Sequence, residues 1–228
     1  MNTVSLLAML QSQDSLFPIG AFTLSNGLET LVQEMVITTP KDLQEYVKSY
    51  LSVMPYNELG VMVLAYRNWQ DMIFIQELDE YYAALRVPME VRQGSEKLCR
   101  RFLKILEHIK EKDFSVLNSY YEKMRKRECY GHQPVAVGLY AREQGVPLKE
   151  AVTIYGYNIL SAIVTNTVKS VPLSQMEGQK ILFEAFLDLE TAVIQAQKVS
   201  FMDIGIGQTE CEIAAMRHEI LYSRLYMS

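Results

Sequence analysis

The segment Cys129-Tyr130-Gly131-His132 separates a thiol from an imidazole by two residues, a spacing that can ligate zinc or nickel. A complete site needs further ligands, and the other histidines, His108 and His218, fall in unrelated helical segments. A structural turn that holds a hydrogen-bonded histidine is the simpler interpretation. We therefore expect no resident metal or cofactor, and Cys129 and His132 stay as weak candidates for a metal site.

Signatures of catalysis are otherwise scarce. The sequence has no P-loop, no G-x-G-x-x-G, no G-x-S-x-G and no H-E-x-x-H. The uncharged segment 151–168 does carry polar side chains, and a buried polar site built from Tyr155, Asn158 and His132 is one alternative. A small helical enzyme is therefore the second hypothesis. The leading hypothesis is a protein that binds other proteins and is not an enzyme.

The amino-acid composition further limits the class of protein to which the chain can belong. The chain has 228 residues, of which 49 % are hydrophobic and 21 % charged, and its formal net charge is -5. Such a chain is long enough to bury one sizeable core, and its overall field repels nucleic-acid phosphate. The odd number of cysteines, three, favours reduced thiols over a disulfide framework. We expect a cytoplasmic protein that binds neither nucleic acid nor membrane, since the longest uncharged run is too polar to span a bilayer.

The elements that position these residues are predicted to be helices. Apolar residues recur with helical spacing in three stripes: Leu43, Tyr46, Val47, Tyr50, Leu51 and Met54; Leu98, Phe102, Ile105, Leu106 and Ile109; and Leu182, Ala185, Phe186, Leu189, Val193 and Ala196. Thr39 and Ser174 are predicted caps at helix starts. The short apolar runs 72–75 and 135–138 are assigned to helices as well. The sequence thus predicts an all-α fold, a single compact multi-helix domain over residues 1–228.

The segment from Phe17 to Glu29, FPIGAFTLSNGLE, resembles the P-x-G-[AS]-[FY]-[ST]-x-S-x-G-L-E signature of the urease accessory protein F (UreF) family. Val168 to Gln175 followed by Gly178-Gln179 is similar to the central motif of that family. His132 with Gly138 resembles its H-x-x-x-x-x-G helix start, and the end of the chain carries the S-R-L-[FY] core of its tail. These matches follow one another in the family order from near the first residue to the last.

The resemblance implies an all-α accessory protein that assists nickel insertion into urease. Members of the family bind a scaffold accessory protein, called D or H, and this pair recruits the GTPase accessory protein G. The complex then delivers nickel to apo-urease. Members commonly form homodimers, and regulation of the GTPase or gating of metal transfer is their proposed role.

The resemblance also implies where partners bind. The expected partner-binding residues are Pro18, Gly20, Phe22, Ser25, Glu29, Lys169, Pro172, Gln175, Tyr222, Arg224, Leu225 and Tyr226. Phe22 stands where many members have tyrosine, so a role that needs the hydroxyl is absent here. Ser25 is expected to cap the helix that follows it.

The end of the chain, residues 207–228, is predicted to form a tail. Gly205-Ile206-Gly207 is interpreted as a hinge, and Thr209 to Glu212 as a capping box that starts a last helix. Beyond Ile220 apolar and aromatic residues surround a single cation, Arg224. This end either packs on the domain or docks at the accessory complex and becomes ordered there. The family resemblance favours docking, with Arg224 bound to a carboxylate or carbonyl of the partner.

Overall fold

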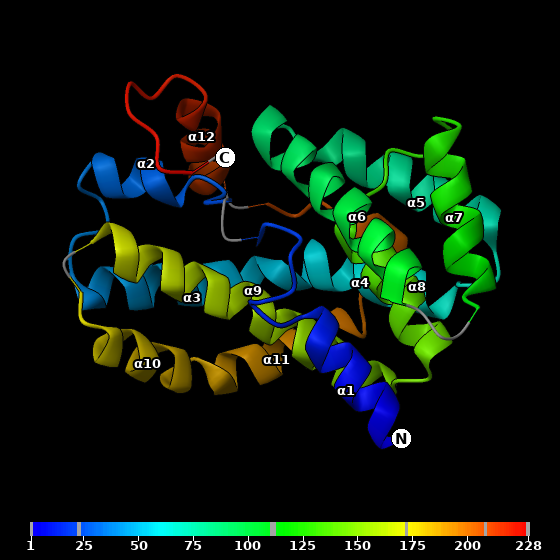
Figure 1. Ribbon diagram of the computed structural model, residues 1–228. Helices are drawn as coiled ribbons and strands as arrows, with labels where there is room; N and C mark the ends of the chain where they lie inside the picture. The colour runs from blue at the N-terminus through cyan, green and yellow to red at the C-terminus, as the bar shows by residue number, and fades with distance from the viewer. Residues whose placement is uncertain (1, 22–23, 110–112, 172, 208, 227–228) are drawn as a thin grey trace.

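The computed structural model describes residues 2–21, 24–109, 113–171, 173–207 and 209–226. Over these residues the chain is a succession of helices without a strand (Figure 1), which confirms the all-α prediction. Their bounds are α1 (Thr3–Ser12), α2 (Leu28–Gln33), α3 (Pro40–Val53), η2 (Met54–Tyr56), α4 (Glu58–Arg67), α5 (Met72–Leu85), α6 (Met89–Ile109), α7 (Ser115–Arg125), α8 (Gln133–Gln144), α9 (Leu148–Ser170), α10 (Gln175–Glu184), α11 (Phe186–Ala196), η3 (Phe201–Asp203) and α12 (Thr209–His218). No helix among the described residues is long and apolar enough to cross a membrane.

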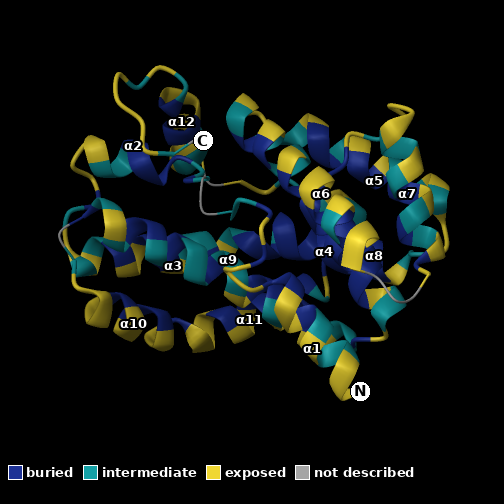
Figure 2. Ribbon diagram, in the orientation of Figure 1, coloured by how far each residue is buried: buried dark blue, intermediate teal, exposed yellow. Residues whose placement is uncertain are grey.

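Helices α4 and α8 form the centre of the core. Both are buried along most of their length, as Figure 2 shows for α4. Helix α9 lies against both of them, and helices α6 and α7 lie against α8. The two central helices approach closely at Gly138, where an added Cβ would lie 2.5 Å from the carbonyl oxygen of Met62 and 3.2 Å from the amide nitrogen of Tyr66. The glycine of the H-x-x-x-x-x-G motif therefore permits backbone contact between the helices on which the fold is built.

Gly138→Ala is expected to lower the free energy of unfolding by about 2 kcal/mol, because overpacking at rigid backbone forces the helices apart. Gly94→Ala in α6 is the matched control, since its Cβ would meet only side-chain atoms of Leu24, the nearest at 3.1 Å. There the gain of about 1 kcal/mol in helix propensity should dominate. Urea unfolding of both variants measures the difference, and equal effects would contradict this explanation of Gly138.

Most of the predicted helix signals are found. Thr39 caps α3 and exchanges hydrogen bonds with Asp42, and Ser174 caps α10 in the same way with Glu177. The apolar run 72–75 lies in α5, and 135–138 lies in α8. The stripe on α3 is buried except for half-buried Tyr50, and Met54 continues it into η2.

Two local predictions are wrong, and a third is confirmed only in part. Ser25 does not cap α2: the capping position is Gly27 with a left-handed φ of 88°, and the Ser25 carbonyl accepts the Leu28 amide instead. Thr209 is the first residue of α12, not the residue that caps it. The stripe 182–196 is divided between α10 and α11, and the division at Ala185 leaves Phe186 41 % exposed.

The glycine segment before α12 is fixed by hydrogen bonds. Gly205 has a φ of 97° and donates its amide to the carbonyl of Tyr56, while the Asn57 side chain donates to the carbonyl of Ile206. The chain thus turns sharply here and leads α12 onto α2.

Candidate functional site

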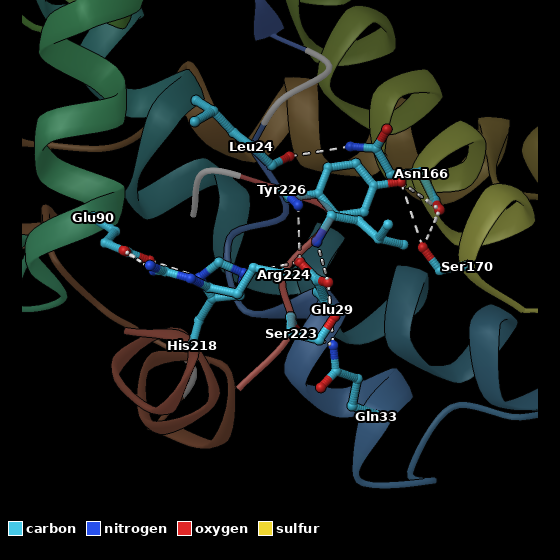
Figure 3. Close-up of polar contacts among 11 residues, drawn as sticks. Leu24, Glu29, Gln33, Glu90, Asn166, Ser170, His218, Ser223, Arg224 and Tyr226 are labelled. Atoms are coloured by element: carbon cyan, nitrogen blue, oxygen red, sulfur yellow. Dashed lines mark hydrogen bonds and ion pairs between the residues drawn. The ribbon is translucent and has the colours of Figure 1, made fainter. Parts of the chain in front are cut away.

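The last described residues, 219–226, turn back from α12 across the molecule, and we call them the strap. Figure 3 shows that Glu29 of α2 is the centre of its attachment. One Glu29 oxygen accepts the Leu225 amide at 2.7 Å, and the other accepts the Tyr226 amide at 3.1 Å. Glu29 is only 2 % exposed. A single buried carboxylate thus holds two consecutive amides of the strap.

His218, the last residue of α12, connects Glu29 to α6. Its Nε2 lies 3.0 Å from Glu29 Oε2 and its Nδ1 lies 2.6 Å from Glu90 Oε2. The other Glu90 oxygen accepts a hydrogen bond from Arg224 of the strap at 2.8 Å. Glu29, His218, Glu90 and Arg224 therefore form a continuous chain of polar contacts from the buried side of the strap to its edge.

The strap is also attached at α9 and at the end of α2. The Tyr226 hydroxyl donates to the Asn166 carbonyl at 3.2 Å and lies 3.4 Å from the Ser170 hydroxyl. The Asn166 side chain donates to the carbonyl of Leu24, and Gln33 of α2 donates to that of Ser223. The strap is therefore bonded to the end of α9, which in turn holds the loop before α2.

Gly27 explains how α12 comes so close to α2. An added Cβ there would lie 2.6 Å from the amide nitrogen of Ala215 and 2.9 Å from the carbonyl oxygen of Cys211, both in the backbone of α12. The residue also has a positive φ, which side chains disfavour. The S-x-G-L-E part of the motif thus forms the docking site of the tail. Gly27 allows close approach of the α12 backbone, and Glu29 binds the end of α12 and the strap.

The Glu29 carboxyl is kept ionised. Burial alone raises its pKa, but hydrogen bonds from the Leu225 amide, the His218 ring and the Tyr226 amide together lower the pKa below its ordinary 4.5. A carboxyl whose pKa is lower when the strap is docked than when it is free stabilises docking at pH values above its ordinary pKa. That support is lost as the pH falls through the lowered pKa.

The outer face of the strap is apolar. Ile220, Tyr222 and Leu225 are 84 %, 106 % and 76 % exposed. Because Leu225 donates its amide to Glu29 while its side chain points to solvent, the strap is fixed by its backbone and presents its side chains. Such a surface suits contact with another protein.

The structure brings together four of the predicted partner-binding residues, namely Glu29, Arg224, Leu225 and Tyr226. Tyr222 lies on the same strap.

Ser25 is buried, and its hydroxyl has no hydrogen-bond partner among the described residues. Pro18 and Gln175 are exposed elsewhere, and Gly20 is half-buried with a φ of 86°. Lys169 is exposed in the last turn of α9, beside Ser170. Phe22 and Pro172 lie outside the described residues.

In this structure the tail packs on its own domain, which is the first of the two arrangements left open by the sequence. The carboxylate that binds Arg224 is Glu90 of the same chain. His218, Glu90 and Asn166 were not predicted for this site. No local pattern marks Glu90, because only the fold brings the start of α6 beside the end of α12.

The Cys129–His132 segment is built around Asp79 of α5. This fully buried carboxylate accepts the amides of Tyr130 (2.7 Å), Gly131 (3.1 Å) and His132 (3.0 Å) and the hydroxyl of Tyr120 (2.6 Å). The backbone of this turn is hydrogen-bonded as expected, but neither nitrogen of the His132 ring has a partner among the described residues. The prediction of a hydrogen-bonded His132 ring is therefore wrong. The ring is held by packing against the ring of Tyr82.

The segment does not gather metal ligands. Within the described ranges no group of three His, Cys, Asp or Glu side chains is arranged to hold an ion. Burial raises the pKa of Cys129 to about 12, which disfavours the thiolate that binds metals. The alternative polar site is not assembled either, because Tyr155 and Asn158 line one pocket together and His132 is not among the residues that line it.

His132→Ala is expected to lower the free energy of unfolding by about 3 kcal/mol, since it empties a fully buried aromatic site, and to leave any nickel affinity almost unchanged. Urea unfolding and calorimetric titration with nickel measure the two effects. Loss of tight, stoichiometric nickel binding with an unchanged melting temperature would contradict it.

Burial of His132 also predicts that the folded protein loses stability in acid. Burial lowers the His132 pKa from 6.5 to about 4, so the unfolded chain takes up a proton in this interval and the folded chain does not. Stability should therefore fall by about 3 kcal/mol as the pH drops from 6.5 to 4. His132→Phe keeps an aromatic ring and should remove that part of the slope. An unchanged slope in this variant would assign the acid sensitivity to other groups.

Fold and site together define an all-α protein whose C-terminal strap is fastened by its backbone and exposes its side chains. The family model described as UreF matches residues 37–186. Urease accessory protein UreF of Haemophilus influenzae is 36 % identical over 228 residues, covering 97 % of this chain and 94 % of the relative. The proteins of the same name from Actinobacillus pleuropneumoniae and Streptococcus salivarius are 35 % and 31 % identical, with 97 % of this chain covered in each case and 98 % and 94 % of the relatives. The chain belongs to the UreF family.

Proposed function

We propose that this chain is an adaptor in nickel-dependent urease maturation. It binds the D/H scaffold accessory protein, and the pair recruits the G GTPase and acts on apo-urease. Membership of the UreF family over nearly the whole chain supports the process. On this proposal the chain works in the cytoplasm, and its contribution is binding, without catalysis of its own.

The observation that carries the adaptor role is the exposed apolar face of the strap. Ile220, Tyr222 and Leu225 point outward from a backbone fixed on Glu29. Two further exposed apolar residues, Met35 and Val36, follow the end of α2, where Gln33 binds the strap. A partner that covers this area would bury large apolar side chains already held in place, which lowers the entropic cost of binding. We assign this surface to the scaffold protein.

A second copy of the chain is the other proposed partner. Phe183, Phe186 and Leu187 of α10 and α11 are exposed, and the ring of Phe186 contacts both Phe183 and Tyr157 of α9. This aromatic patch is separate in sequence from the strap and can serve self-association while the strap binds the scaffold. Light scattering of the wild type and of Leu187→Asp measures whether a dimer forms and depends on the patch.

A cell that produces urease and the other accessory proteins, but lacks this chain, tests the maturation role. Urease activity and nickel content of purified urease should both be restored when the chain is supplied. Equal activity and nickel content with and without the chain would refute the role. Apo-urease that remains inactive in cells with a strap-deleted chain would connect the function to the strap.

A further inference from the structure

The contacts of His218 fix how many protons the strap site holds. Both ring nitrogens face carboxylate oxygens, Nδ1 at 2.6 Å from Glu90 and Nε2 at 3.0 Å from Glu29. An ionised carboxylate can only accept hydrogen bonds, so each contact needs an N–H from the ring. A neutral imidazole has one N–H, and therefore the site contains one proton more than the neutral ring with two carboxylates would supply.

The other contacts of the two carboxylates place that proton on the ring. Glu29 accepts two strap amides and the Gln33 side chain, and Glu90 accepts the Arg224 guanidinium. All of these contacts come from N–H donors, so they require acceptor oxygens on both carboxyls. The ring of His218 is then an imidazolium between two carboxylates, and it is completely buried.

We propose that docking of the strap is proton-linked: the doubly protonated ring of His218 joins Glu29 to Glu90 and holds the strap, and loss of this proton at higher pH releases it. The proposal concerns the isolated chain and does not depend on the role in urease maturation. It assigns the strap a second, open state that is reached without a partner.

The charges around the ring support this dependence. Glu29 from α2 and Glu90 from α6 face it, and Arg224 of the strap balances the second carboxylate. The site is neutral with the imidazolium and has a charge of about -1 without it. The nearby groups do not replace the lost charge, because Arg217 is paired with Glu34 at the surface and Glu219 accepts the Met89 amide.

The direction of the effect follows from linkage. The docked strap contains the proton, whereas the ring of an undocked strap is free to lose it to water. Docking is therefore favoured at low pH and weakens as the pH rises through the value at which the docked site loses the proton. Without it, one ring nitrogen and a carboxylate oxygen are two acceptors in buried contact, which is unfavourable. Between the pH at which the free ring loses its proton and the higher pH at which the docked site loses it, each pH unit can weaken docking by up to about tenfold.

Hydrogen exchange of the full-length chain between pH 6 and pH 9 tests the proposal. Protection of the 221–226 amides, corrected for the intrinsic effect of pH, should fall by about tenfold or more, while protection of α4 stays constant. Nitrogen NMR of the His218 ring should show an imidazolium at pH 6 and its titration over the same interval. Protection that does not change with pH, or a neutral ring at pH 6, would overturn the proposal.

Two variants separate this ring from other titrating groups. His218→Gln keeps one donor and one acceptor but cannot titrate, so its strap protection should be weaker at pH 6 and independent of pH. His108→Gln removes an exposed histidine of α6 and should keep the wild-type pH dependence. A pH dependence that persists in His218→Gln would assign it to another group and overturn the proposal. The ring NMR of the wild type decides the question if His218→Gln does not fold.

Discussion

Asp79→Ala is expected to lower the free energy of unfolding by about 4 kcal/mol. The buried carboxylate accepts three consecutive amides, those of residues 130–132, and the Tyr120 hydroxyl. Its removal leaves these donors without an acceptor in the core, and each orphaned donor costs about 1 kcal/mol or more. Chemical unfolding at pH 7.5, where His132 is neutral in both states, measures the effect.

The control for this variant is Glu80→Ala. Glu80 is the next residue of α5, is exposed, and has the same charge. It should change stability by less than about 0.5 kcal/mol, as is usual for surface positions. If Asp79→Ala were no more destabilising than Glu80→Ala, the turn before α8 would not depend on the buried carboxylate.

Glu29→Ala is expected to undock the strap while the rest of the fold remains. The change removes the acceptor of the Leu225 and Tyr226 amides and one partner of His218. Three lost hydrogen bonds at about 1 kcal/mol each correspond to an increase of about 100-fold in hydrogen exchange of the strap amides. Exchange in α4 and α8 should be nearly unchanged.

Glu34→Ala provides the comparison on the same face. Glu34 adjoins the end of α2 and also pairs with α12, through Arg217, but this pair is 40–56 % exposed. Exposed ion pairs contribute little, so strap exchange should change less than about threefold. Similar exchange in Glu29→Ala and Glu34→Ala would show that the strap is held by something other than the buried carboxylate.

The fold class could be predicted because helical periodicity and caps are local signals. The caps formed by Thr39 and Ser174 are visible within four consecutive residues, and the amphipathic stripe from Leu43 to Met54 spans only twelve. The Ser25 cap could not be judged in this way. Whether Ser25 or Gly27 begins α2 depends on α12, whose backbone lies against Gly27 and comes from the other end of the chain.

The site was predicted only in part for a similar reason. Family motifs indicated Glu29 and Arg224, but not that Glu29 receives strap amides or that Arg224 binds Glu90. The sequence likewise gives no sign that His218 is a buried bridge, since an isolated histidine near a chain end is ordinarily exposed. Such pairings join residues more than 120 positions apart, and they follow from packing of α12 between α2 and α6.

The central claim is that the fixed strap is the surface that binds the accessory proteins. Size-exclusion chromatography of the chain mixed with the D/H scaffold and the G GTPase tests it most directly, using the wild type, Arg224→Ala and a chain lacking residues 221–228. Circular dichroism first establishes that all three chains keep their helix content. We expect the wild type to elute in the ternary complex, and both altered chains to leave the scaffold or the GTPase unbound. A truncated chain that forms the full complex with wild-type affinity would contradict the account.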